Sequence, residues 1–276
     1  MTHDPPEPAA LLELALDAAR AAGRYLVDER PADLDVAATK TSPTDVVTAM
    51  DRGSERLIVA RLRTARPRDG VLGEEGAADA GSSGVRWVID PVDGTVNYLY
   101  GLPEWAVSVA AEVDGVVVAG VVHAPALGET WTATLGGGAA LDGRVLRRER
   151  GVALERALVA TGFSYESANR ALQARLLVEV LPCVRDVRRA GSAALDLCGV
   201  AGGRHDGYFE RGTHHWDIAA AALVAREAGV TVGGLPGAGE SEDLVVAAAE
   251  PLFAELQGLL AAHWPYAARA DDVAPS

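Results

Sequence analysis

A run of strand patterns around a two-residue turn dictates how the first half of this 276-residue chain folds. Residues 106–113 and 116–123 are rich in small and β-branched apolar side chains, and only Asp114-Gly115 separates them. An Asp-Gly pair between two such runs favours a tight hairpin turn, because both residues tolerate positive φ. Further strand patterns at 85–89 and 130–135 flank the hairpin. Consecutive strands of this kind predict a largely antiparallel sheet.

Helical patterns precede this sheet and then alternate with strands after it. Apolar residues recur at helical spacing over 9–30 and 53–66, and Pro31 ends the first of these runs. The second half alternates predicted strands with predicted helices; the strands are 158–161, 207–210 and 244–248, and the helices are 167–181, 192–199, 215–228 and 251–263. This order indicates an α/β (α+β) fold. We expect one domain over 1–276, with halves of roughly 1–150 and 151–265 and a frayed end at 267–276.

The charge balance excludes some classes of partner. Lysine and arginine number 25 against 39 acidic residues, which gives a net charge of −14. Proteins that bind the nucleic-acid backbone usually present a basic face, so we expect no nucleic-acid partner.

Residues 1–7 lack a basic segment followed by an apolar core, and no apolar run reaches the length of a membrane span. With Cys183 and Cys198 as the only cysteines, we expect a reduced, cytoplasmic protein without a membrane partner.

Two aspartates follow directly after the predicted strand 85–89. Asp90 and Asp93 flank Pro91 and Val92, and Gly94-Thr95 come next. Because proline restricts the backbone, both carboxylates can converge at the strand end with the Val92 carbonyl between them. Mg²⁺ prefers carboxylate and carbonyl oxygens, and backbone N–H groups after a glycine can bind phosphate. The alternative is a solvated acidic turn in which the aspartates only cap the backbone.

Two further acidic groups are candidates for the same chemistry. Glu74-Glu75 stand between two glycines, where one carboxylate can bind a metal and position a water, or both can lie in a solvated loop. Asp217 falls in the first turn of the predicted helix 215–228, where a capping role explains it equally well. The neighbouring His214-His215 pair does not indicate zinc, because adjacent residues do not share one helix face and no cysteine or third histidine stands at ligand spacing.

A basic cluster, Arg185, Arg188 and Arg189, lies between two predicted helices of the second half. It can attract a phosphate group, or it can form a solvated surface, as charge clusters usually do. Ser108 and Ser192 have no evident histidine and aspartate partners, so the sequence does not indicate a serine nucleophile.

Together these segments resemble the inositol monophosphatase family of Mg²⁺-dependent, lithium-sensitive phosphatases. The first family signature is similar to residues 87–98, and the second to residues 216–229. The Gly-Glu-Glu segment at 73–75, the segment 40–51 and Gly191-Ser192-Ala193-Ala194 also fit, in the order of the family, across roughly residues 9 to 262. The resemblance implies a layered α-β-α-β-α sandwich with a largely antiparallel first sheet and a mixed second sheet, assembled as a homodimer.

The resemblance also implies a role for individual residues. Metal ligands would be the carboxylates of Glu74, Asp90, Asp93 and Asp217 together with the Val92 carbonyl, with Mg²⁺ as the cofactor. Gly94 and Thr95 would hold the phosphate, and Glu74 and Thr95 would orient the attacking water. Ala193, Glu210 and Asp217 would contact the substrate, and Asp51 and Lys40 would support the metals from further away. The resemblance implies that Glu74, Asp93 and Thr95 form the catalytic set.

The implied reaction is hydrolysis of a small polyol phosphate, with inositol 1-phosphate as the first candidate. Glu210 favours a polyol monophosphate, because a carboxylate accepts hydrogen bonds from ring hydroxyls and repels a second phosphate. Fructose 1,6-bisphosphate, histidinol phosphate and nucleotide 3′-phosphates remain alternatives within the same chemistry. A non-catalytic metal-binding regulatory protein is the alternative from another class, since a fold does not guarantee its function.

Overall fold

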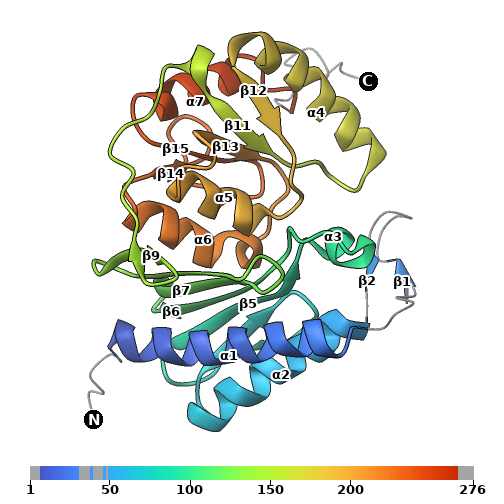
Figure 1. Ribbon diagram of the computed structural model, residues 1–276, viewed down its shortest axis with the longest axis vertical. Coiled ribbons are helices and arrows are strands. Elements are labelled where there is room, and N and C mark those ends of the chain that lie inside the picture. Colours follow the sequence, from blue (N-terminus) through green and yellow to red (C-terminus); the bar gives the residue numbers. More distant parts are fainter. Residues whose placement is uncertain (1–6, 31–37, 40–45, 48, 267–276) are drawn as a thin grey trace, which may run out of the picture.

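The chain folds into five layers, and two sheets alternate with three layers of helices (Figure 1). The computed structural model describes residues 7–30, 38–39, 46–47 and 49–266. The expected layered α/β architecture is therefore confirmed. Within the described ranges, every helix is too short or too polar to cross a bilayer.

The first sheet has eight strands and is antiparallel except at one pair. Their order is β10 (Arg144–Val145), β9 (Gly138–Leu141), β8 (Glu129–Thr134), β7 (Val116–Ala124), β6 (Ala106–Val113), β5 (Val85–Asp93), β3 (Gly70–Gly73) and β4 (Ala78–Asp79). Only β3 and β5 run parallel. The β6–β7 hairpin turns at Asp114 and Gly115, which have φ values of 50° and 82°. The predicted turn is thus confirmed, with the positive φ that this dipeptide permits.

Helices α1 (Pro8–Asp28) and α2 (Ala49–Ala65) cover the outer face of this sheet (Figure 1). Leu11 of α1 and Ile58 of α2 belong to one buried cluster with Trp87 and Ile89 of β5. The short helix α3 (Thr95–Tyr100) directly follows β5, and a two-stranded pair, β1 (Ala38–Thr39) with β2 (Val46–Val47), lies nearby. Of the segment 40–51 that resembles the family, residues 40–45 and 48 lie outside the described residues.

The second sheet is mixed, as expected. Its order is β12 (Asp186–Arg188), β11 (Leu158–Thr161), β13 (Gly207–Glu210), β15 (Val245–Ala248) and β14 (Thr231–Gly233). The β12–β11 and β11–β13 pairs are parallel, whereas β15 pairs antiparallel with both β13 and β14. Short 3₁₀ turns, η1 (Leu154–Arg156) and η2 (Leu181–Cys183), precede β11 and β12.

Helices α5 (Ala193–Ala201) and α6 (His215–Glu227) fill the space between the two sheets, and α4 (Ser167–Val180) and α7 (Leu252–Ala262) cover the outer face of the second (Figure 1). Alternate residues of β13 serve the two layers: Tyr208 belongs to the central cluster, and Phe209 to the outer one. The central cluster also contains residues of β5 and β6, so both halves of the chain share one core.

In the central layer, α6 approaches β7 closely at Gly120. A Cβ placed on Gly120 would lie 2.9 Å from the Ala220 Cα and 3.0 Å from the Ala220 carbonyl oxygen. Backbone atoms cannot yield as a flexible side chain can, so this strand position accepts only glycine without displacing the helix.

We therefore expect Gly120→Ala to lower the free energy of unfolding by about 1–3 kcal/mol, the usual cost of overpacking a core. Gly258→Ala is the matched control, because Gly258 lies on the exposed side of α7 with no atom within 4 Å of its Cβ position. That control should gain up to about 1 kcal/mol from helix propensity. Urea unfolding measures both changes, and equal stabilities of the two variants would contradict the close approach.

Candidate active site

An irregularity near the end of β5 presents the first pair of carboxylates. Asp90 pairs with Ser108 and Asp93 with Ala106, so three steps along β5 match two along β6. Such a bulge redirects side chains beside an active site. The Asp90 Oδ1 atom accepts a hydrogen bond from the Val92 N–H at 3.0 Å, and the Thr95 hydroxyl donates to the Val92 carbonyl at 3.0 Å.

Asp93 joins the two halves of the molecule. Its carboxylate accepts hydrogen bonds from the Ser192 hydroxyl at 2.5 Å, the Ala194 N–H at 2.7 Å and the Ala193 N–H at 3.3 Å, at the start of α5. Burial nevertheless raises the pKa of Asp93 to about 6, because these donors offset only part of the desolvation cost. Asp93 is thus held firmly in place in a site that disfavours its negative charge.

Glu74 lies beside Asp90 because β3 runs parallel to β5. Gly73 pairs with Ile89, and the Glu74 N–H donates to the Ile89 carbonyl at 3.2 Å. The buried Glu55 carboxylate of α2 fixes this loop by accepting hydrogen bonds from the Glu75 N–H at 2.9 Å and the Ala77 N–H at 3.0 Å. Sequence reasoning missed Glu55, although a glutamate among the buried positions of α2 is a signal that it has backbone partners.

Asp90 and Asp217 complete the acidic cluster. Burial raises the pKa of Asp90 well above its usual value, and the charges of Glu74, Asp93 and Asp217 and a hydrogen bond with Glu74 raise it further. The pKa of Asp217 is also raised, by burial first and then by Asp93 and Glu74. Asp217 does cap α6, accepting from the His214 N–H at 2.7 Å. Capping alone does not account for three further acids within electrostatic reach.

The histidine pair does not form a metal site with these acids. The His214 ring contacts Glu242 at 2.9 Å at the rim, and the His215 ring contacts the buried Glu112 of β6 at 2.5 Å. The two rings therefore contact different acidic partners, Glu242 and Glu112.

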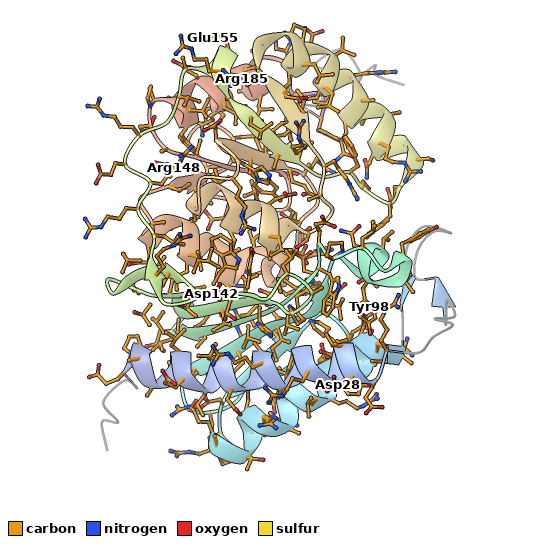
Figure 2. The ribbon with its side chains drawn as sticks, viewed as in Figure 1. Asp28, Tyr98, Asp142, Arg148, Glu155 and Arg185 are labelled. Carbon is orange, nitrogen blue, oxygen red and sulfur yellow. The ribbon has the colours of Figure 1, made fainter. Side chains whose placement is uncertain are left out.

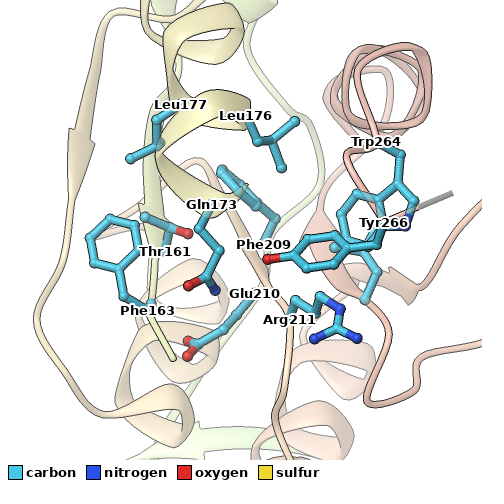
Figure 3. Close-up of a pocket in the computed structure, with 12 residues that line it drawn as sticks. Thr161, Phe163, Gln173, Leu176, Leu177, Phe209, Glu210, Arg211, Trp264 and Tyr266 are labelled. Atoms are coloured by element: carbon cyan, nitrogen blue, oxygen red, sulfur yellow. The ribbon is translucent and has the colours of Figure 1, made fainter. Parts of the chain in front are cut away.

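Glu210 ends β13 and lies within electrostatic reach of Asp93. The Tyr208 hydroxyl donates to its Oε2 atom at 3.0 Å, and burial raises the pKa of Glu210 to about 7. A Cβ on Gly162 would lie 2.0 Å from this carboxylate, so only glycine leaves room for it there. Beside it, Arg211 turns toward Tyr266, with the guanidinium carbon 4.1 Å from the ring centroid, while Glu210 points away (Figure 3).

One open cleft of about 680 Å³ collects most of the predicted residues. It is lined by Glu74, Asp90, Val92, Asp93, Gly94, Thr95, Ala193, Glu210 and Asp217. Asp51 is buried in α2 and does not line the cleft, and Lys40 lies outside the described residues. Of the basic cluster, only Arg189 lines the cleft, whereas Arg185 lies at the end of the molecule formed by the second sheet and its outer helices (Figure 2).

The donor set of this cleft fits a hard divalent cation. Four carboxylates and a backbone carbonyl are oxygen ligands. Burial first, and then the charges of the neighbouring acids, raise the pKa values of Asp90 and Asp217, so a counter-charge would stabilise the ionised cluster. In the part of the chain that the structure describes, no three acidic or imidazole side chains are already grouped around one point. Metal binding would therefore require these carboxylates to turn toward a shared ion.

Comparisons with known proteins agree with this geometry. The sequence profile of the inositol monophosphatase family matches residues 7–268. The inositol-1-monophosphatase SuhB of Mycobacterium tuberculosis is 45% identical over 279 residues, covering 94% of this chain and 96% of that protein. The Nus factor SuhB of Pasteurella multocida is 41% identical over 221 residues, covering 79% of this chain and 83% of the relative.

A solved structure extends the likeness to three dimensions. The crystal structure of the extragenic suppressor protein SuhB from Bartonella henselae superposes with a TM-score of 0.84 at 37% identity, covering 91% of this chain and 98% of that one. The family profile, the relatives and the shared fold agree over nearly the whole sequence. The chain therefore belongs to the inositol monophosphatase family of phosphatases.

Proposed function

We propose that this protein hydrolyses the phosphate monoester of a small polyol, with inositol 1-phosphate as the first candidate and Mg²⁺ as the cofactor. The observation that carries the proposal is that Glu74, Asp90, Asp93 and Asp217 line one cleft together with Glu210. The M. tuberculosis relative carries the name of this activity.

In this proposal Glu74, Asp90, Asp93, Asp217 and the Val92 carbonyl hold the metal. Mg²⁺ would supply Lewis-acid stabilisation of the phosphoryl oxygens and lower the pKa of a bound water. Gly94 and Thr95 bind the phosphate, and Thr95 with Glu74 orients the attacking water. The Thr95 hydroxyl donates to the Val92 carbonyl in this structure, so it must exchange that partner when the site fills.

Glu210 would select the alcohol part of the substrate. With a pKa of about 7 it accepts hydrogen bonds from a ring hydroxyl when ionised and donates one when protonated. Ala193, at the start of α5, leaves space beside it for the ring.

Phosphate release with Mg²⁺ tests the proposal, measured on inositol 1-phosphate, fructose 1,6-bisphosphate, histidinol phosphate and a nucleotide 3′-phosphate. We expect preference for inositol 1-phosphate, loss of turnover on chelation, and inhibition by lithium. Preference for another ester would keep the chemistry and change the substrate. If none of the four esters is hydrolysed while Mg²⁺ still binds, the result would instead favour the non-catalytic regulatory role. One relative of this chain is named as a Nus factor.

A single domain, a homodimer and a cytoplasmic location stay predictions. The core shared by both halves supports the first of them.

A further inference from the structure

We propose that Arg189 is a further catalytic residue, whose guanidinium contacts the phosphoryl group of the bound ester. The inference rests on the proposed phosphatase activity and adds a positively charged side chain to a site whose other charged groups are mainly acidic. It is carried by the position of the segment that bears Arg189, by the direction of its side chain, and by its lack of an ion pair or hydrogen bond with any residue that the structure describes.

The segment 189–191 is fastened to the turn that holds Gly94 and Thr95. The Asn97 amide of α3 donates to the Ala190 carbonyl at 2.8 Å and to the Glu104 carbonyl at 2.6 Å. The Gly191 carbonyl lies so close to Gly94 that a Cβ there would be 3.2 Å from it. Arg189 therefore leaves the backbone directly beside the proposed phosphate-binding turn.

The guanidinium folds back over Gly191. A Cβ on Gly191, which has a φ of 101°, would lie 2.6 Å from the Arg189 Nη1 atom and 3.1 Å from the Asn97 amide nitrogen. Arg189, Gly191, Gly94 and Thr95 all line the same cleft. A side chain in this position reaches the space above the phosphate-binding turn.

Arg189 has no ion pair or hydrogen bond within the described ranges, and its side chain is exposed. Its neighbour Arg188 provides a contrast, because the Arg188 Nη1 atom donates to Asp186 at 2.5 Å and to the Val187 carbonyl at 2.9 Å. The charge of Arg189 acts on Glu210 in the cleft, because it lowers the pKa of Glu210 against the larger effect of burial.

A phosphoryl group is the ligand that fits this guanidinium best. Its planar pairs of N–H donors match two phosphate oxygens, and charge-assisted bonds of this kind are stronger than neutral ones. Because Arg189 lines the same cleft as Gly94 and Thr95, its guanidinium would bind a phosphoryl oxygen beside the phosphate-binding turn.

The test compares Arg189→Ala and Arg189→Lys with the matched control Arg188→Ala. We expect kcat/KM of Arg189→Ala to fall about 10- to 100-fold on both inositol 1-phosphate and glycerol 2-phosphate, with a similar rise in the inhibition constant of inorganic phosphate. Arg189→Lys should recover part of this loss, and Arg188→Ala should stay within about twofold of the parent, because Arg188 does not line the cleft.

Three outcomes would overturn the proposal. A loss confined to inositol 1-phosphate would place Arg189 on the ring hydroxyls, and an equal loss in Arg188→Ala would reduce its role to general surface charge. Unchanged kinetics in Arg189→Ala would exclude the contact. If the parent protein hydrolyses no ester, calorimetric binding of inorganic phosphate with Mg²⁺ still decides the role of Arg189, because only Arg189→Ala should weaken it.

Discussion

Replacing Asp93 with asparagine is expected to lower kcat at least about 10³-fold while the protein still folds. The proposed site depends on Asp93 both as a metal ligand and as the link to α5, and losing about 4 kcal/mol of transition-state stabilisation gives this factor. An amide oxygen is a weaker ligand for Mg²⁺ than a carboxylate, so more metal should not fully restore turnover.

The fold should survive this substitution. An amide oxygen in the place of Oδ2 still accepts from both the Ser192 hydroxyl and the Ala194 N–H, and only the longer bond from the Ala193 N–H is lost. Because burial raises the pKa of Asp93 to about 6, the charge that is removed is one that the folded protein disfavours at neutral pH. Near-ultraviolet circular dichroism and thermal unfolding check the fold, and phosphate release at saturating substrate and Mg²⁺ measures kcat.

Two companion variants keep this result interpretable. Asp90→Asn removes a neighbouring acid that does not bond α5, and it should lose activity to a similar degree. Asp69→Asn is the control, because Asp69 is equally buried and accepts bonds from Arg66, Ser83 and Trp87 outside the cleft. The Asp69→Asn variant should lose stability but keep its kcat per folded molecule. Near-normal turnover in Asp93→Asn would refute the proposed site.

The sequence patterns predicted the elements that are long or strongly periodic. The hairpin at Asp114-Gly115 and the helices α1, α6 and α7 lie within about four residues of their expected bounds. Helix α2 begins at Ala49 rather than residue 53. Helical periodicity fixes the buried face of a helix better than its first turn, where the pattern is incomplete.

Short elements and neighbours in the sheets were beyond the patterns. Strands β12 and β14 have only three residues each, which is too few to establish a period of two. The place of β12 beside β11 depends on η2 and on the packing of α4, which sequence spacing does not encode. Helix α3, of six residues, was not among the predicted helix ranges.

The candidate site was better predicted than the contacts that support it. The acids and Gly94-Thr95 can be selected from the sequence by residue type, and all of them line the cleft. Glu55 acts through backbone N–H groups twenty residues away, and the Arg189 guanidinium lies over Gly191, where a Cβ would be 2.6 Å from its Nη1 atom. Both are tertiary facts that follow only from the packing of α2 and α5 against the first sheet.

Asp196 is a buried acid for which the proposed chemistry has no use. It lies on α5 with 1% of its surface exposed, and in the described part of the chain neither carboxyl oxygen has a hydrogen-bond partner. The nearest imidazole nitrogen, His205 Nδ1, is 3.8 Å from its Oδ1 atom. Burial first, and then the charges of Glu210 and Asp93, raise the pKa of Asp196 to about 8 against the opposing effect of Arg189.

This pKa makes the stability of the protein depend on pH in a definite direction. The usual pKa of an aspartate, 3.8, applies to the unfolded chain, so between about pH 4 and pH 8 the folded state binds one more proton than the unfolded state. Stability is therefore highest on the acid side of this window and falls as pH rises through it. At about 1.4 kcal/mol per unit, the contribution of Asp196 declines by at most roughly 4 kcal/mol between pH 5 and pH 8.

Asp196→Asn should remove this dependence, because the amide is neutral at every pH. We expect the stability of the variant relative to the parent to rise by up to about 4 kcal/mol from pH 5 to pH 8. The unpaired amide adds a fixed cost that is the same at every pH. Urea unfolding at four pH values with chelator present measures the difference. Asp206→Asn is the control, since Asp206 bonds Arg148 at 2.6 Å and the Leu158 N–H at 3.0 Å, and its loss should destabilise the fold at pH 7. A difference between Asp196→Asn and the parent that stays constant with pH would show that Asp196 is ionised in the folded protein, with its charge stabilised by groups other than those around it here.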